Sequence, residues 1–115
     1  MARLRMRILF EGDHSVGPGK VGLLEAVEQH GSISAAARSM GMAYRHAWEM
    51  IDDMNRCFRE PVVETATGGA RGGGAQVTAF GARLVRRFRA MEERVEKTVA
   101  RDLAALDRER ATGGR

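Results

Sequence analysis

Cysteine, proline and aromatic residues are scarce in this chain of 115 residues, and long apolar runs are missing. The single cysteine, Cys57, excludes an internal disulfide and any metal site built from several cysteines. We expect it to be a small buried side chain late in a helix. No apolar run is long enough to cross a membrane, and the opening MARLRMRILFEGD lacks the hydrophobic segment of a signal peptide. We therefore expect a cytoplasmic protein.

Charge and length narrow the class of protein further. There are 19 Lys and Arg residues against 15 Asp and Glu, which gives a formal net charge of +4. This small excess of positive charge is compatible with a polyanion as a partner. The preference for Arg over Lys indicates either phosphate and guanine recognition or a GC-rich genome. The length suits one domain, expected over residues 1–110 with a disordered tail at 111–115, and leaves no room for a second, ligand-binding domain.

Residues 31–54, GSISAAARSMGMAYRHAWEMIDDM, predict a helix-turn-helix. Two helices that cross at a sharp angle need a small residue at the crossing and a flexible residue at the turn. Ala37 suits the crossing, and Gly41 can adopt the positive φ of a tight turn. An ordinary hairpin of two amphipathic helices is the alternative. The shared core is expected to include Ala36, Met40, Met42, Ala47 and Met50.

The rest of the chain predicts a mainly α fold with a small β wing, a winged helix-turn-helix followed by a long C-terminal dimerisation helix. Alternation between Arg3 and Phe10 indicates a strand with a basic outer face and Leu4, Met6, Ile8 and Phe10 inside. Residues 12–19 look like a loop, with Pro18 starting a helix, Ser32 or Ser34 capping the next helix and Thr78 capping the last. The expected elements are a strand at 3–10, helices at 18–30, 33–40 and 43–57, a wing at 62–78 and a helix at 79–110.

The predicted last helix carries a continuous apolar stripe. Its first part can pack on the core, but its later part has nothing else in the chain to cover it. A second copy of the chain is the economical cover, because a lone amphipathic helix of this length would expose its stripe. A partly disordered end is the alternative. The expected dimerisation residues are Leu84, Phe88, Met91, Val95, Val99, Leu103 and Leu106.

The second helix of a helix-turn-helix enters the DNA major groove with its first turns. The residues expected to pack that helix on the core are Ala47, Met50, Ile51 and Met54. Arg45, Glu49 and Asp52 then lie on the opposite side. Arg45 is the first choice for reading a base, because guanidinium matches the two acceptors of guanine. Glu49 either accepts from a cytosine amino group or is a solvated charge.

The flanks of this helix offer weaker candidates. Tyr44 and His46 suit phosphate contacts better than base contacts. Trp48 either covers the core or touches a thymine methyl group or a sugar. Asp52 and Asp53 are expected to point away from the DNA backbone, because their charge opposes binding.

Further contacts are expected from the preceding helix and from the wing. Ser32, Ser34 and Arg38 can hold phosphates, or they are only caps and a surface charge. Arg71, between glycines of the wing, suits an adjacent minor groove, or it belongs to a mobile loop. The complete set of expected DNA-binding residues is Ser32, Ser34, Arg38, Ala43, Tyr44, Arg45, His46, Trp48, Glu49, Thr67 and Arg71.

Nucleotide binding and catalysis are not indicated. The stretch ATGGARGGGA lacks the Gly-Lys-Ser/Thr that ends a phosphate-binding loop, and a strand follows it in place of a helix. His14, His30 and His46 are scattered, with no Cys or carboxylate at ligand spacing. We expect neither an enzyme, nor a cofactor, nor a metal.

The segments GSISAAAR, YRHAW, ATGGARGGGA and VTAFG resemble the N-terminal DNA-binding domain of ModE-type molybdate-responsive transcriptional regulators, which is related to the winged helices of LysR-type regulators. The resemblance covers about Arg3 to Val95. It implies a bacterial homodimer joined through the last helix, on a roughly two-fold symmetric operator. Regulators of that family carry a C-terminal molybdate-binding module, and no residues here match it, so molybdate sensing is not carried over.

The favoured hypothesis is a homodimeric, sequence-specific transcriptional regulator that binds double-stranded DNA. A sensor of an oxyanion or a metal and a winged helix used for protein contact are the alternatives. The operator, the regulated genes, the sign of regulation and any effector or partner protein do not follow from the sequence.

Overall fold

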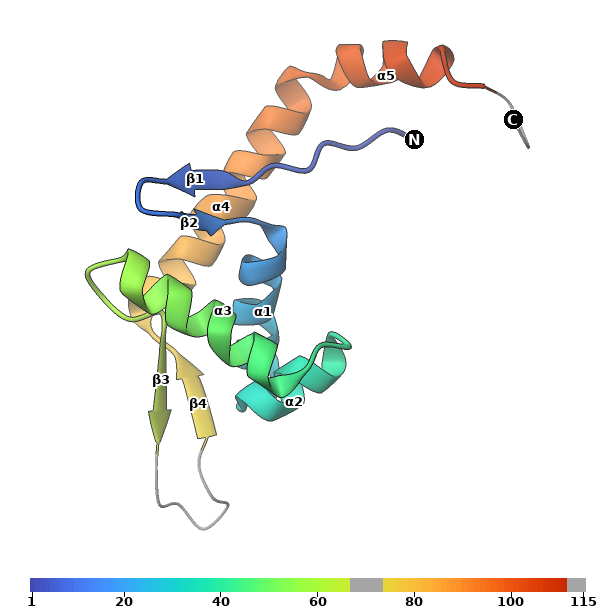
Figure 1. Ribbon diagram of the computed structural model, residues 1–115. Coiled ribbons are helices and arrows are strands. Elements are labelled where there is room, and N and C mark those ends of the chain that lie inside the picture. The colour runs from blue at the N-terminus through green and yellow to red at the C-terminus, as the bar shows by residue number, and fades with distance from the viewer. Residues whose placement is uncertain (67–73, 112–115) are drawn as a thin grey trace.

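Helices form most of the chain. One short antiparallel hairpin precedes the first helix, and a second one lies between the third and fourth helices (Figure 1). The structure is a computed structural model that describes residues 1–66 and 74–111. The mainly α fold with a small β wing predicted from the sequence is confirmed. In chain order the elements are β1 (Ile8–Phe10), β2 (His14–Val16), α1 (Pro18–His30), α2 (Ile33–Ser39), α3 (Tyr44–Cys57), β3 (Val63–Ala66), β4 (Gly74–Val77), α4 (Ala79–Thr98) and α5 (Ala100–Arg108).

The N-terminal strand is shorter than the predicted 3–10, and part of the expected loop at 12–19 is a strand. β1 pairs antiparallel with β2, with Phe10 opposite His14. Gly12 and Asp13 both adopt positive φ, 82° and 64°, and this tight turn reverses the chain within the hairpin. The predicted inner face is also partly wrong, because Leu4 and Phe10 are exposed whereas Met6 and Ile8 pack partly against the core.

Local signals set the ends of the helices. α1 covers the predicted 18–30, with Pro18 in its first turn and Gly31 in the left-handed conformation at its end. The Ser32 side chain accepts a hydrogen bond from the Ala35 N–H and thereby caps α2. Thr78 caps α4 in the same way through the Gly81 N–H.

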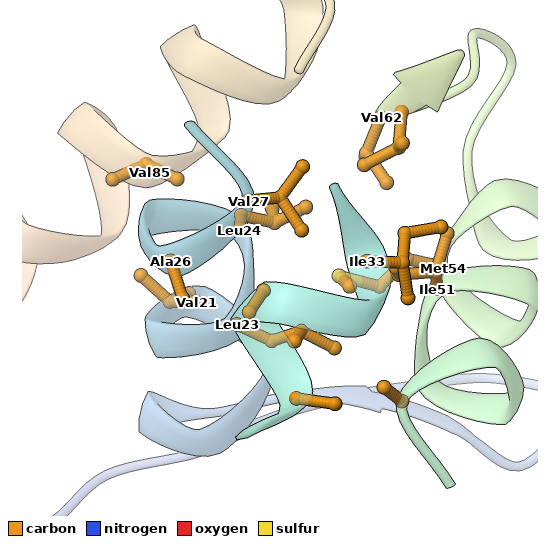
Figure 2. Packing of buried hydrophobic residues seen from close by; sticks show 14 of the residues in the cluster. Val21, Leu23, Leu24, Ala26, Val27, Ile33, Ile51, Met54, Val62 and Val85 are labelled. Atoms are coloured by element: carbon orange, nitrogen blue, oxygen red, sulfur yellow. The ribbon is translucent and has the colours of Figure 1, made fainter. Parts of the chain in front are cut away.

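One apolar core joins α1, α2, α3, the base of the wing and the first half of α4 (Figure 2). Leu23 and Leu24 of α1 lie at its centre with no exposed surface. Burying each of these side chains contributes about 2 kcal/mol. The other fully buried large side chains are Val16, Val21, Val27, Ile51, Met54, Val62 and Phe88.

Three predicted core positions lie closer to the surface than expected. Met40 follows the end of α2 and is 37% exposed, because the chain turns away from the core there. Met42 and Met50 are half-buried and pack on the edge of the core. Cys57 is half-buried as well, at the last residue of α3.

The predicted helix at 79–110 is broken. α4 ends at Thr98, α5 begins at Ala100, and the helical arm changes direction between them (Figure 1). At the break the Thr98 hydroxyl donates to the Arg94 carbonyl, and such a side-chain bond to the backbone bends helices. Among the described helices, none is both long and apolar enough to span a membrane.

Candidate nucleic-acid interface

A tight turn sets α3 across α2. Gly41 adopts φ 65° between the two helices, as predicted. Ala36 and Ala37 of α2 and Ala47 of α3 are at most 2% exposed, so small side chains let the helices approach closely. The Met42 N–H donates to the Ala37 carbonyl over 3.0 Å and fixes the turn.

The start of α3 projects side chains into solvent on the side opposite the core. Ala47, Ile51 and Met54 face inward, as expected, whereas Arg45 and Glu49 are exposed. Within the part of the chain that the structure describes, Arg45 has no carboxylate within 4.0 Å. Its guanidinium is therefore available for a partner molecule.

Tyr44, His46 and Trp48 flank this exposed side. Tyr44 is 54% exposed and meets the half-buried Trp48 edge to face, with ring centroids 6.3 Å apart. The His46 Nδ1 atom lies 3.7 Å from a carboxylate oxygen of Glu49. Trp48 packs against the core with part of its ring and leaves the rest accessible, so both predicted roles remain compatible with its position.

The acidic residues near the end of α3 are bound within the chain. Asp53 accepts from Lys20 of α1 over 2.5 Å and lies 2.9 Å from the Nδ1 atom of His14 in β2. The hydrogen bond from Lys20, and to a smaller extent that from His14, lowers the pKa of Asp53 against the opposing effect of burial. Asp52 pairs with Arg56 one turn further along α3. Neither carboxylate is a free negative charge on this surface.

Sequence reasoning did not identify the contact between Lys20 and Asp53. Their positions are 33 residues apart, on separate helices, and local periodicity carries no signal for such a pair. The network joins α1, β2 and α3, and it therefore fixes the orientation of α3.

The start of α2 brings three predicted residues together. Ser32 is the cap described above. Two residues later, the Ser34 hydroxyl accepts from the guanidinium of Arg38, one turn further along α2, over 2.9 Å, and both side chains are exposed. A helix N-terminus with hydroxyl groups and a guanidinium nearby can hold a phosphate. Ala43, also a predicted site residue, is the exposed N-cap of α3 and provides no side-chain cap there.

The wing is anchored to this same unit. β3 pairs antiparallel with β4, with Val63 opposite Val77. The Ala75 N–H donates to the Gly31 carbonyl over 3.0 Å and ties β4 to the end of α1. In Figure 1 the two strands project away from the helical core, below α3. The predicted contact residues Thr67 and Arg71 lie outside the described residues.

Together, these elements place an exposed guanidinium, two aromatic rings and hydroxyl groups on the solvent side of a helix-turn-helix. Hydrogen-bond donors of this kind match phosphate oxygens and base edges. Within residues 1–66 and 74–111, no three His, Cys, Asp or Glu side chains gather into a group that could hold a metal ion.

Comparison with known sequences matches one bacterial protein family and several named relatives. Residues 20–82 match the family described as "Bacterial regulatory helix-turn-helix protein, lysR family". The chain is 40% identical over 88 residues to the molybdenum-pterin-binding protein MopA of Rhodobacter capsulatus, covering 76% of this chain and 33% of MopA. It is 41% identical over 95 residues to the molybdenum transport protein ModE of Azotobacter vinelandii, covering 83% and 34%.

A third relative is the DNA-binding transcriptional dual regulator ModE of Escherichia coli (strain K12). It is 41% identical over 71 residues, covering 62% of this chain and 27% of the relative. The chain thus spans about a third of the length of the curated relatives it matches. These relatives confirm the resemblance to ModE-type regulators that the sequence indicated.

Solved structures share the fold. The structure described as a CbnR_DBD–DNA complex matches with a TM-score of 0.58 at 19% identity, covering 76% of this chain and 95% of that one. A point mutant of S. aureus MepR bound to an oligodeoxyribonucleotide matches with a TM-score of 0.55 at 18% identity, covering 79% and 66%.

Proposed function

We propose that this chain, which belongs to the bacterial regulatory helix-turn-helix proteins of the lysR family, is a sequence-specific DNA-binding transcriptional regulator that acts as a homodimer. The observation that carries the proposal is the start of α3, where Arg45 is exposed to solvent opposite a fully packed inner face. Such a regulator would work in the cytoplasm, on bacterial DNA.

In this proposal α3 enters the major groove and Arg45 reads a guanine through its O6 and N7 atoms. Tyr44 and His46 contact the neighbouring phosphates, and Ser34 with Arg38 holds a phosphate at the start of α2. The wing follows the duplex into the adjacent minor groove, where we place Thr67 and Arg71.

The apolar side of the helical arm, formed by the second half of α4 and by α5, supports the proposed homodimer. Leu106 of α5 is 64% exposed, and the other apolar residues along the arm beyond the core are only partly covered. A second copy would bury this surface and set two α3 helices on one duplex. Phe88 is removed from the predicted interface, because it is 1% exposed within its own core, and Leu84 packs partly there. The proposed interface comprises Met91, Val95, Val99, Leu103 and Leu106.

Selection of bound sites from random duplexes tests the proposed function. The wild type should enrich two related half-sites in inverted orientation, with centres about 10 base pairs or a small multiple apart. Arg45→Ala should lose preference at one base position of each half-site, at a cost of about 1–3 kcal/mol against the preferred base.

Equal loss at every position in Arg45→Ala would refute the role of Arg45 in reading a base. Failure of the wild type to enrich any sequence would refute the proposed function.

A second candidate, an oxyanion-responsive regulator, is favoured by the names of two relatives, which refer to molybdenum. Calorimetric titration of the protein with molybdate and with tungstate distinguishes the two. Binding at micromolar concentration would support the second candidate, and the absence of heat would leave the first.

A further inference from the structure

A cleft of about 450 Å³ opens beside the start of α3. Four parts of the chain line it: the segment before β1, β2, the start of α1 and the outer flank of α3. His46, one residue after Arg45, belongs to its wall, so the cleft adjoins the surface proposed to enter the major groove. The lining residues are Arg5, Met6, Arg7, Ser15, Gly17, Pro18, Gly19, Lys20, His46 and Met50.

The lining carries cationic side chains and, among the described residues, no carboxylate. The charge of Lys20 is balanced by Asp53, and His46 has Glu49 within 3.7 Å. Arg5 and Arg7 differ from these two. Among the ion pairs of the described residues, neither arginine takes part in one, and both side chains are exposed. The cleft therefore holds an excess of positive charge that these residues do not neutralise.

The Arg7 side chain packs against the wall of the cleft at Gly17. A Cβ atom on Gly17 would lie 2.9 Å from the Arg7 Cγ atom, so the aliphatic part of Arg7 rests on the bare backbone of Gly17. Gly17 is also the N-cap of α1, where no side chain caps the helix and no acidic residue stands in the first turn. The positive end of the α1 dipole adds to the charge of the two arginines.

We propose that this cleft binds one backbone phosphate of the duplex that α3 reads, and so extends the contact beyond the helix-turn-helix and the wing. The inference rests on the proposed function. A duplex phosphate fits better than a free anion, because Arg5 and Arg7 are exposed and suit a ligand that stays attached to a larger molecule. Two guanidinium groups offer the forked donors that match phosphate oxygens.

Binding of a selected duplex to the full chain, measured by fluorescence anisotropy over a salt series, tests the inference. The double variant Arg5→Ala/Arg7→Ala should bind about tenfold more weakly at low salt. The slope of log K against log salt should fall by about one unit, with the base preference unchanged. Arg101→Ala, which removes one charge, is the control, because Arg101 is exposed on α5, is not among the cleft residues and forms no ion pair within the described residues.

Gly17→Ala provides a variant with all charges retained. Gly17 has a φ of −137°, which any residue can adopt, but the added methyl group must displace the Arg7 side chain. We expect affinity to fall while the thermal unfolding midpoint stays close to that of the wild type.

Duplexes with a single uncharged methylphosphonate locate the phosphate. At one position beside each half-site, the methylphosphonate should weaken binding of the wild type and of Arg101→Ala. At the same position it should not weaken binding of Arg5→Ala/Arg7→Ala. If the same position stays sensitive in the double variant, the inference is wrong while the proposed function stands. If the wild type binds no duplex, both are wrong. If inorganic phosphate binds the protein tightly without DNA and competes with the duplex, the cleft is a free-anion site and the inference is overturned.

Discussion

Two adjacent carboxylates of α3 differ in what they hold in place. Asp53 joins α3 to Lys20 of α1 and His14 of β2, whereas Asp52 pairs only with Arg56 of its own helix among the described residues. An exposed pair one turn apart contributes a few tenths of a kcal/mol to stability. Asp53 ties elements distant in the sequence, so its loss affects the tertiary structure.

Asp53→Asn should lower the free energy of unfolding at neutral pH by about 1 kcal/mol, because a buried part of Lys20 loses its counter-charge while a third of Asp53 remains in solvent. Asp52→Asn is the neighbouring control and should change stability by less than about 0.5 kcal/mol. Urea unfolding of the three proteins measures both differences.

The pH dependence gives a further check on Asp53. Its pKa in the folded chain lies below the ordinary value of 3.8, chiefly because of the hydrogen bond from Lys20. The stabilisation is therefore complete above the unfolded pKa and is lost as the pH falls through the lower folded pKa. The gap between wild type and Asp53→Asn should close in that acidic range. A gap that is unchanged by acid would contradict the role assigned to Asp53.

Among the elements, the helices were the most predictable. Pro18 and Gly31 mark the ends of α1 through backbone geometry that the residue types themselves impose. β2 cannot be predicted from periodicity, because its three residues are too few to show a period, although Gly12 and Asp13 provide a turn signal. The break before α5 has no signal in the sequence, because neither Gly nor Pro marks it and Thr98 and Val99 continue the helical pattern.

The candidate site is likewise predictable from the sequence only in part. The inner and outer sides of α3 follow from a period of 3.6 residues, so the exposure of Arg45 and Glu49 was predictable. The contacts of Lys20 with Asp53 depend on how distant helices pack, which periodicity does not encode. Periodicity also groups Phe88 with the apolar residues beyond it, although Phe88 belongs to the core of its own chain.

The contact between α4 and the wing gives a prediction at the element scale. A Cβ atom on Gly81 would lie 2.4 Å from the Val62 carbonyl oxygen, so α4 rests against the chain just before β3 only because Gly81 has no side chain. Gly81→Ala should lower the free energy of unfolding by about 1–3 kcal/mol through this overlap.

Gly22→Ala is the matched control in another helix. There the added methyl group would lie 3.4 Å from the flexible end of Met40, an ordinary contact. We expect a gain in stability of up to about 1 kcal/mol from helix propensity. The midpoint of thermal unfolding should fall in Gly81→Ala and rise in Gly22→Ala. A fall of equal size in both variants would contradict the close approach at Gly81.

The molecule as a whole is elongated. Its radius of gyration is 17.2 Å and its longest dimension 56 Å, whereas about 13 Å is typical for the radius of gyration of a compact chain of this length. The arm formed by the second half of α4 and by α5 extends beyond the core (Figure 1). The Ala2 N–H donates to the Asp107 carboxylate, so the N-terminal segment contacts α5 near the end of that helix. Leu106 remains exposed beside it.

Leu103→Glu/Leu106→Glu should convert a dimer into a monomer, because four added charges cannot be buried at a two-fold interface without partners. Light scattering should give half the wild-type mass. The affinity of the variant for a duplex with two half-sites should fall towards its affinity for a duplex with a single half-site. Ala104→Glu/Ala105→Glu adds the same charge at exposed positions of α5 outside the proposed interface and should leave the mass unchanged. A monomeric wild type at the same concentration would refute the proposed dimer.

Trp48 is the one tryptophan of the chain, and it stands half-buried on α3 beside Tyr44. The protein therefore carries an intrinsic fluorophore at the surface proposed to meet the duplex. Its emission reports the local environment of α3 alone, so unlabelled protein suffices to follow the kinetics of association in a stopped-flow instrument.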